Sequence, residues 1–459
     1  MTEKFDAIII GTGQAGPSLA QRMTGEGMKT AIIERKLFGG TCVNVGCIPT
    51  KALVASARVA HMARRGSEFG VTIPGPIEVD MMQVKARKDA IVKQSSDGVT
   101  NWLKTMKNLT VFEGHGRFES ADTVRVNGNL LQADKIILNV GGRAVVPDMP
   151  GIEEVSYLTN TSIMDVDVLP DHLIVIGGSY IGLEFAQMYR RFGSRVTVIQ
   201  RGPQLIERED DEVCEAVKEI LENEGIDIRL NADCVGFARR GDQVAVSASC
   251  EPGIEEIVGS HVLLAVGRKP NTDDLGLEAA GLEVDERGYI VVDDELRTNV
   301  TGIWAMGDAN GRGAFTHTSY NDYEILAANM FDNDPRRVAD RITAYGLFID
   351  PPLGRVGLSE AQARDTGRKI LVGKMQMARV GRARERSETQ GFMKILIDAE
   401  SKRILGASLL GIGGDEIVHS LLDLMYANAL YTVILRAMHI HPTVSELIPT
   451  MLGDLKPLE

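Results

Sequence analysis

The sequence predicts an α/β fold in which two parallel-sheet units precede a smaller α+β domain. Glycine-rich segments at residues 11–16 and 177–182 each lie between a short apolar run and a helical pattern. Short, fully apolar runs indicate strands of a parallel sheet that is buried on both faces. Beyond about residue 342 the pattern changes to two apolar-rich runs, 392–397 and 404–410, which indicate antiparallel strands and a different kind of domain.

Length, charge and hydropathy indicate a multidomain protein and disfavour nucleic-acid-binding, secreted and membrane proteins. The 459 residues exceed what one hydrophobic core holds, so several domains are expected. A net charge of −13, from 63 acidic and 50 basic residues, disfavours nucleic acid as a partner. The first residues lack a signal-peptide pattern, and no apolar run approaches the roughly 20 residues that span a bilayer. We therefore expect a cytoplasmic protein that binds neither nucleic acid nor membrane.

The first unit carries a complete dinucleotide-binding fingerprint. Residues 7–10 form an apolar strand, and Gly11, Gly13 and Gly16 follow in the GxGxxG spacing before a helix. These glycines permit a tight turn and a close approach of the backbone to a pyrophosphate, which the helix N-terminus also attracts. The next strand ends in Glu34, an acid that can hold a ribose hydroxyl. The unit is therefore expected to be Rossmann-like.

The second unit repeats this arrangement with two departures. Gly177 and Gly182 keep the spacing, but Ser179 replaces the middle glycine. The second strand of this unit ends in Gln200 instead of an acid, and Arg201 follows at once. A cation suits the 2′-phosphate of NADPH, whereas an acid would repel it. We therefore expect NADPH in preference to NADH; the alternative is that Arg201 is an ordinary exposed arginine.

The segments between and after the fingerprints complete the two units. Residues from about 52 to 112 are expected to be helical and amphipathic, and strands at 135–142 and 261–268 close the two units. A further strand at 302–306 leads to Asp308. An acid at the carboxyl end of a parallel strand lies where ligands bind in such folds.

Cys42 and Cys47 are the most informative residues. A thiol pair beside a bound nucleotide can move two electrons, because one cysteine attacks a substrate while the other exchanges electrons with the cofactor. The alternatives are two buried apolar cysteines or a metal pair, but the spacing is not that of zinc sites, so no metal site is expected. Cys214, Cys234 and Cys250 are expected to be non-catalytic.

Five motifs, in order along essentially the whole chain, resemble the flavin-dependent pyridine nucleotide–disulfide oxidoreductases, such as glutathione reductase, dihydrolipoamide dehydrogenase and mercuric reductase. The motifs are the first fingerprint, the segment 42–51, the second fingerprint with Glu184, residues 306–308, and 441–443 with Glu446. The resemblance is closest to a mercuric-reductase-like branch without the C-terminal cysteine pair, since the last cysteine is Cys250.

The resemblance implies the domains and the assembly. An FAD-binding domain would comprise residues 1–148 and 268–341, an NAD(P)H-binding domain 149–267, and an interface domain 342–459. The fold class would be two Rossmann-like dinucleotide-binding domains plus a C-terminal α+β dimerisation domain. The family is homodimeric, and each active site borrows a histidine of the other subunit.

The resemblance also assigns the cofactor-binding residues. FAD would be held by Gly11, Gly13, Gly16, Glu34, Thr41, Lys51 and Asp308. The nicotinamide nucleotide would be held by Gly177, Gly182, Arg201 and Arg268, and Tyr180 would cover the nicotinamide pocket until the cofactor enters.

By the same resemblance, NADPH would reduce the flavin and the flavin would reduce a Cys42–Cys47 disulfide. Cys47 would face the flavin and Cys42 would attack the substrate. Lys51 would pair with Glu184 and stabilise the anionic reduced flavin.

The acid and base for Cys42 would be His441. An imidazole has a suitable pKa to exchange a proton with a thiol, and Glu446 would orient it. His439 competes for the role, but the His-Pro-Thr motif with the following glutamate selects His441.

The expected electron acceptor is a small disulfide. The alternatives are a mercuric reductase that reduces Hg(II), a dihydrolipoamide dehydrogenase, or an NAD(P)H oxidase or quinone reductase. A redox sensor without a dedicated substrate would not need His441 and Glu446. The arginine-rich segment 379–386 either binds an anionic substrate or forms a solvated or dimer-contacting face. A role for His317 or Tyr320 stays open.

Overall fold

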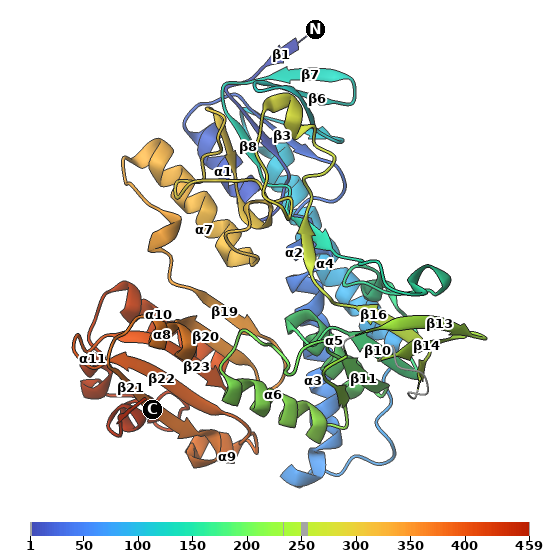
Figure 1. Cartoon of the computed structure of the whole chain (residues 1–459), viewed down its shortest axis with the longest axis vertical. Coiled ribbons are helices and arrows are strands. Elements are labelled where there is room, and N and C mark those ends of the chain that lie inside the picture. Colours follow the sequence, from blue (N-terminus) through green and yellow to red (C-terminus); the bar gives the residue numbers. More distant parts are fainter. Residues whose placement is uncertain (1, 233, 249–255, 459) are drawn as a thin grey trace.

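The computed structural model describes residues 2–232, 234–248 and 256–458, and it has the predicted α/β class. Figure 1 shows three bodies: the first parallel sheet with its helices at the top, the second at the lower right and the C-terminal domain at the lower left. Helices α3 (Cys47–Arg64) and α4 (Met81–Thr105) run from the first body down to the second.

The first body is built on a five-stranded parallel sheet in the order β18-β8-β2-β3-β4. Its strands are β2 (Ala7–Ile10), β3 (Thr30–Glu34), β4 (Leu109–Glu113), β8 (Ile136–Leu138) and β18 (Ile303–Ala305). Because β18 follows the second unit in the sequence, the first body is discontinuous along the chain. The domain boundaries at 148, 268 and 341 stay predictions.

Different layers cover the two faces of this sheet. Helices α1 (Ala15–Gly25) and α7 (Thr316–Ala327) pack side by side against one face, where Leu19, Met23 and Leu326 are buried. The other face packs against a second sheet in the order β1-β7-β6-β5, whose residues Val124 and Leu131 are buried. These strands are β1 (Thr2–Lys4), β5 (Arg117–Ser120), β6 (Thr123–Val126) and β7 (Asn129–Gln132).

The helical prediction for residues 52–112 is confirmed for α3 and α4 and wrong for the residues between and after them. Residues 71–80 have no regular structure except a bend at Gly75, and Leu109–Glu113 form the edge strand β4. The segment around Val111 is rich in β-branched and aromatic residues, which favour a half-buried strand. The short helix α2 (Gly40–Asn44) precedes α3.

The second body repeats the parallel arrangement with the order β12-β11-β10-β16. Its elements are β10 (His172–Ile176), α5 (Tyr180–Phe192), β11 (Arg195–Ile199), α6 (Asp211–Asn223), β12 (Asp227–Arg229) and β16 (His261–Leu264), with an antiparallel sheet of β13 (Gly236–Arg240), β14 (Gln243–Ser247) and β15 (Ile257–Gly259). The pair β9 (Gly142–Ala144) and β17 (Arg268–Pro270) bridges the chain segments that lead into and out of this body.

The C-terminal domain contains a six-stranded antiparallel sheet in the order β19-β20-β23-β22-β21-β24. Its strands are β19 (Ala344–Leu347), β20 (Leu353–Gly357), β21 (Ile370–Gln376), β22 (Phe392–Asp398), β23 (Ile404–Leu410) and β24 (Lys456–Pro457), and its helices are α8 (Glu360–Asp365), α9 (Gly381–Glu385), α10 (Gly414–Tyr426), α11 (Thr432–Arg436) and α12 (Leu447–Leu452). The antiparallel strands predicted at 392–397 and 404–410 are confirmed.

Buried contacts hold the three bodies together. Helix α3 packs against α5, and the guanidinium of Arg191 on α5 lies 2.7 Å from Glu224 and 2.5 Å from Asp350, which precedes β20. Breaking a buried ion pair of this kind by removing one partner is costly, because the other charge is left without compensation. Within the described part of the chain, no helix has both the length and the apolar character needed to cross a membrane.

Candidate active site

A cavity of about 850 Å³ lies where the first glycine turn, the cysteine segment and the start of α5 converge. Eleven of the predicted site residues line it: Gly11, Gly13, Glu34, Thr41, Cys42, Cys47, Lys51, Tyr180, Glu184, Arg268 and Asp308. Six others are not part of its wall: Gly16, Gly177, Gly182, Arg201, His441 and Glu446.

The first glycine turn is closed by backbone contacts that exclude larger residues. Gly11 has φ of +106°, and a Cβ atom there would lie 2.3 Å from the carbonyl oxygen of Asn139. A Cβ atom on Gly16 would lie 2.4 Å from the carbonyl oxygen of Gly11. The amide and hydroxyl of Thr12 donate to Glu34 Oε2 at 3.1 and 2.6 Å, so that the carboxylate is fixed at the turn.

The residues around this turn fit a bound dinucleotide. The side-chain amide nitrogen of Asn139 is buried and has no hydrogen-bond partner among the described residues. Buried donors are nearly always satisfied, so this atom points to an acceptor on a ligand. Asp308 lines the same cavity, where burial raises the pKa of its carboxyl, and Arg268 Nη2 lies 3.5 Å away. Together with the N-terminus of α1, which begins within this glycine turn, these groups can hold FAD.

Cys42 and Cys47 are both thiols in the structure, and their environments differ. Cys47 is the first residue of α3, where the helix N-terminus favours a thiolate, and its sulfur lies 3.2 Å from the hydroxyl of Thr316. A hydrogen bond from the Cys42 thiol lowers the pKa of Cys47 to about 6, against the opposing effect of burial, and Thr316 and the Lys51 ammonium act in the same direction. The same hydrogen bond, together with burial, raises the pKa of Cys42. Cys47 is therefore the thiolate of the pair at neutral pH.

A cation is fixed beside the cysteines by contacts from three parts of the chain. Lys51 Nζ lies 2.8 Å from Glu184 Oε2, and the side chain of Glu184 is only 8% exposed. The backbone amide of Phe348 donates to Glu184 Oε1 at 3.0 Å, and the Lys51 ammonium lies 4.2 Å from the centre of the Phe348 ring. The predicted pairing of Lys51 with Glu184 is thus present in the geometry.

The second glycine turn has the same backbone construction. Gly177 has φ of +111°, and a Cβ atom on Gly182 would lie 2.1 Å from the carbonyl oxygen of Gly177. Gln200 Oε1 accepts from the amide of Gly178 at 2.8 Å, and Gln200 Nε2 donates to Glu207 Oε1 at 2.9 Å. A carboxylate therefore reaches this turn from position 207, although the strand itself ends in glutamine.

His441 and Glu446 form a pair away from the cavity. His441 Nδ1 lies 2.9 Å from Glu446 Oε2, and the His441 side chain is 82% exposed. The neighbouring apolar residues Met438 and Ile440 are also exposed, on the surface of the C-terminal domain. His439 Nδ1 lies 3.2 Å from the carbonyl oxygen of Ala437. The single chain therefore does not bring His441 to the cysteines.

Two family models cover most of the chain. The model of the pyridine nucleotide-disulphide oxidoreductases matches residues 5–322, and the model of their dimerisation domain matches residues 343–452. The chain belongs to the pyridine nucleotide-disulphide oxidoreductase family. It is a flavoprotein disulfide reductase that uses FAD and a nicotinamide nucleotide, and its C-terminal domain is the dimerisation domain of a homodimer.

Proteins with similar sequences or structures match this oxidoreductase over at least 91% of its length. It is 35% identical over 461 residues to the probable pyridine nucleotide-disulfide oxidoreductase RclA of Escherichia coli, covering 99% of this chain and 100% of that one. It is 32% identical to the mercuric reductase of Bacillus cereus, covering 91% of this chain and 66% of that one. The solved structure of a Cu(II) complex of the HOCl-induced flavoprotein disulfide reductase RclA from E. coli is similar with a TM-score of 0.90 and 34% identity, covering 98% and 99% of the two chains.

Three site residues of this oxidoreductase were not predicted from its sequence: Asn139, Thr316 and Phe348. Asn139 follows the apolar run of β8, and a polar residue at the carboxyl end of a parallel strand was an available signal. Thr316 lies in the segment noted for His317, which instead stacks on Phe315 and contacts the carbonyl oxygen of Ala344 at 2.6 Å.

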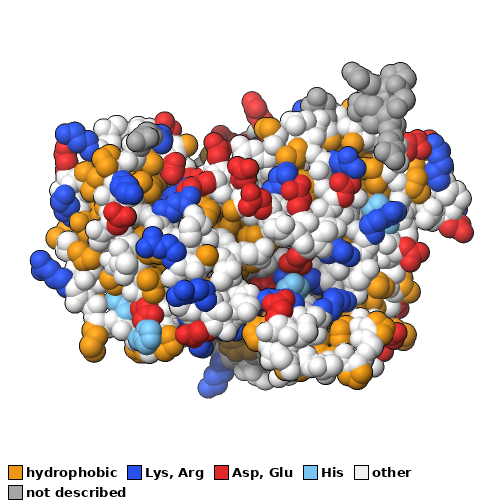
Figure 2. All heavy atoms as spheres, turned by 90° about the horizontal axis from the view of Figure 1, so that it is seen from below, with side chains coloured by type: hydrophobic (Ala, Val, Ile, Leu, Met, Phe, Trp, Pro, Cys, Tyr) orange, Lys and Arg blue, Asp and Glu red, His pale blue; other side chains and the backbone are white. Residues whose placement is uncertain are grey.

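Other features noted in the sequence lie outside the cavity. Cys214 is buried in α6, Cys234 precedes β13, and Cys250 lies outside the described residues. The arginines of 379–386 are exposed on and around α9, where Arg382 pairs with Glu385. On the face seen from below, basic and acidic side chains are interspersed (Figure 2). The exposure of these arginines and the Arg382–Glu385 pair favour a solvated face for the arginine-rich segment.

The low pKa of Cys47 predicts a pH dependence in the reduced enzyme. A thiolate beside oxidised FAD gives absorbance beyond 500 nm, which is lost when the sulfur is protonated. We expect this absorbance to fall with a midpoint near pH 6 as the pH is lowered. Thr316→Val removes a donor to the thiolate and should move the midpoint upward, whereas Thr105→Val, at the exposed end of α4, should leave it unchanged. A midpoint near the ordinary thiol value of about 8.5 would contradict the assignment.

Proposed function

We propose that this oxidoreductase uses NADPH in preference to NADH to reduce a small disulfide at Cys42 and Cys47. The observation that carries the proposal is that a Cys47 thiolate and a Cys42 thiol lie in one cavity with the first glycine turn, the start of α5 and the Lys51 ammonium. Bound FAD supplies a two-electron carrier between the nicotinamide and the cysteines. It would be held by the residues of the first turn together with Glu34, Thr41, Lys51 and Asp308.

The chemistry at sulfur begins when the Cys42 thiol, whose pKa is raised, gives its proton to a base. Cys42, as a thiolate, attacks one sulfur of the substrate, and the substrate disulfide breaks to give a mixed disulfide and a first thiol. The Cys47 thiolate then attacks the sulfur of Cys42, which releases the second thiol and forms the Cys42–Cys47 disulfide. Two electrons thus pass to the substrate for each cycle; the Cys42 thiol supplies one of the two protons, and solvent supplies the other because Cys47 is already a thiolate.

Both proton transfers need an acid and base near Cys42. We assign this role to His441 of the partner copy, because in its own chain His441 is exposed and held by Glu446 outside the cavity. The exposed Met438 and Ile440 support burial of this region against a second copy. The imidazole takes the proton of the Cys42 thiol and returns it to the departing sulfur.

Shared active sites predict complementation between inactive subunits. Cys42→Ser and His441→Ala homodimers should each lose most activity, since each lacks one member of both sites. A heterodimer of the two variants contains one intact site and should recover up to about half of the wild-type rate per dimer. Steady-state rates of purified, differently tagged heterodimers measure this. No recovery would contradict the shared arrangement.

The preference for NADPH rests on charge around the end of β11. Arg201 and Arg208 are exposed there, and two guanidinium groups suit a 2′-phosphate, although Glu207 brings one carboxylate to Gln200. The other proposed contacts of the nicotinamide nucleotide are the backbone of the turn at Gly177 and Gly182, with Tyr180 and Arg268 in the cavity.

Single substitutions near the end of β11 can change the charge that a 2′-phosphate would meet. Arg201→Glu should raise the KM for NADPH about tenfold and leave the KM for NADH nearly unchanged, because only NADPH carries the additional phosphate. Glu207→Gln serves as the matched variant and should lower the KM for NADPH. Steady-state kinetics with both nucleotides decide the point, and equal effects of Arg201→Glu on the two would contradict the preference.

A second candidate acceptor is a soft metal ion. Thiolate sulfur binds soft metals, the relative from E. coli was solved as a Cu(II) complex, and mercuric reductase is among the similar proteins. Within residues 2–232, 234–248 and 256–458, no group of three or more His, Cys, Asp or Glu side chains could hold a metal ion. We therefore rank disulfides first, and rates with glutathione disulfide, lipoamide, Cu(II) and Hg(II) separate these acceptors.

A further inference from the structure

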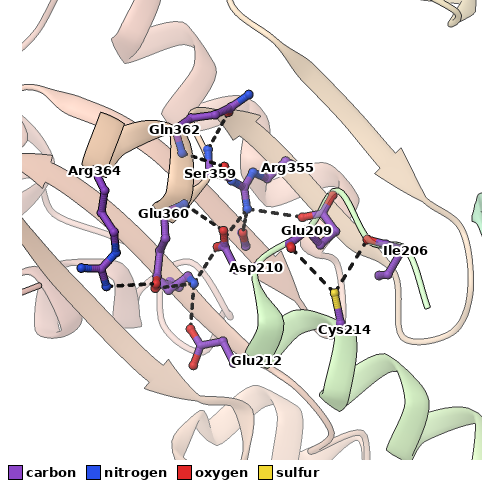
Figure 3. Close-up of polar contacts among 12 residues, drawn as sticks. Ile206, Glu209, Asp210, Glu212, Cys214, Arg355, Ser359, Glu360, Gln362 and Arg364 are labelled. Carbon is purple, nitrogen blue, oxygen red and sulfur yellow. Dashed lines mark hydrogen bonds and ion pairs between the residues drawn. The ribbon is translucent and has the colours of Figure 1, made fainter. Parts of the chain in front are cut away.

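A buried cluster of charged side chains joins the second body to the C-terminal domain, and the proposed reaction does not use it. Figure 3 shows Glu209 and Asp210, which precede α6, facing Arg355 of β20. Arg355 Nη1 lies 3.3 Å from Glu209 Oε2 and 3.1 Å from Asp210 Oδ2, and Lys394 Nζ of β22 lies 2.6 Å from Asp210. The side chains of Glu209, Asp210, Arg355 and Lys394 are at most 3% exposed.

Two tyrosines also donate hydrogen bonds to the Glu209 carboxylate. The hydroxyl of Tyr180 donates to Glu209 Oε1 at 2.8 Å, and that of Tyr345 donates to the same oxygen at 2.7 Å. Burial and the Glu209 charge raise the pKa of both phenols, so both remain donors. Their rings meet edge to face with centroids 5.7 Å apart. Both tyrosines also line the active-site cavity.

The two tyrosines are held by different contacts. Tyr345 belongs to β19, and its ring stacks on Phe315 with centroids 5.5 Å apart. Tyr180 is the first residue of α5, directly after the second glycine turn. A rotation of the Tyr180 side chain would leave Glu209 with Tyr345 and Arg355 as donors. The carboxylate would therefore stay satisfied while Tyr180 moves.

We propose that Glu209 and Tyr345 are positioning residues that set how readily Tyr180 uncovers the nicotinamide pocket. The inference rests on the proposed function, in which Tyr180 covers that pocket. In the closed position Tyr180 shares Glu209 Oε1 with Tyr345; in the open position Tyr345 holds the carboxylate without it. Tyr345 thus lowers the free energy needed to rotate Tyr180 away from Glu209, whereas the hydrogen bond of the Tyr180 hydroxyl raises it.

Removing one hydroxyl at each position should therefore have opposite effects. Tyr180→Phe keeps the ring but removes the bond that closes the pocket, so more of the protein is competent to bind the nicotinamide. Tyr345→Phe makes Glu209 depend on Tyr180, because a buried carboxylate that loses a donor holds the remaining one more tightly. A purely structural role for these tyrosines would not give changes of opposite sign.

Isothermal titration calorimetry of the oxidised FAD-loaded enzyme tests this inference without turnover. For NADP⁺ we expect the Kd to fall about fivefold in Tyr180→Phe and to rise about fivefold in Tyr345→Phe, as the weakening or strengthening of one charge-assisted hydrogen bond implies. The Kd of 2′-phospho-ADP-ribose, which lacks nicotinamide, should not change. Tyr189→Phe is the matched control, because Tyr189 also lies on α5 but its hydroxyl contacts the carbonyl oxygen of Ile163.

Unchanged values, changes of the same sign, or equal changes for 2′-phospho-ADP-ribose would overturn the inference and leave the proposed function intact. If the wild-type enzyme bound neither NADP⁺ nor NAD⁺, the proposed function would fail first. Should Tyr345→Phe not fold, the direction of the change in Tyr180→Phe decides by itself: tighter binding of NADP⁺ supports the inference and weaker or equal binding overturns it.

Discussion

The ion pair between Lys51 and Glu184 is the contact on which the geometry of the site depends. Lys51 lies one helical turn after Cys47 on α3, and Glu184 lies one turn after Tyr180 on α5. The pair therefore fixes the distance between Cys47 and Tyr180, which lies in the second glycine segment. Because Glu184 is mostly buried and also accepts from the backbone of Phe348, the C-terminal domain takes part in the same contact.

A second constraint is that two nucleotide-binding turns must serve one pair of sulfurs. Each turn is tight because glycine residues approach backbone carbonyls more closely than any side chain allows, as at Gly11 and Gly182. The units that carry them are joined through β9 and β17 and through the packing of α3 on α5. The motion proposed for Tyr180 is confined to one side chain and leaves these contacts between the units unchanged.

Much of this arrangement was predictable from local sequence. The strands around Gly11 and Gly177, the acid at Glu34 and the antiparallel strands of the last domain follow from patterns of fewer than twenty-five residues. The pairing of Lys51 with Glu184 spans 133 positions and was available only through the family resemblance. Tertiary contacts decided the rest: Tyr345 and Arg355 reach Glu209 across more than 130 positions, which no periodicity reveals. Glu207 lies only seven positions from Gln200, but their contact depends on the path of an irregular loop, which no periodicity reveals either.

The central claim is that two electrons from the nicotinamide nucleotide arrive on Cys42 and Cys47. It is tested most directly by adding one equivalent of NADPH per FAD to the oxidised enzyme without oxygen, quenching with acid and an alkylating reagent, and mapping the cysteines by mass spectrometry. The account predicts that Cys42 and Cys47 change from a disulfide to two alkylated thiols. A protein whose FAD is bleached while that disulfide stays intact would contradict it.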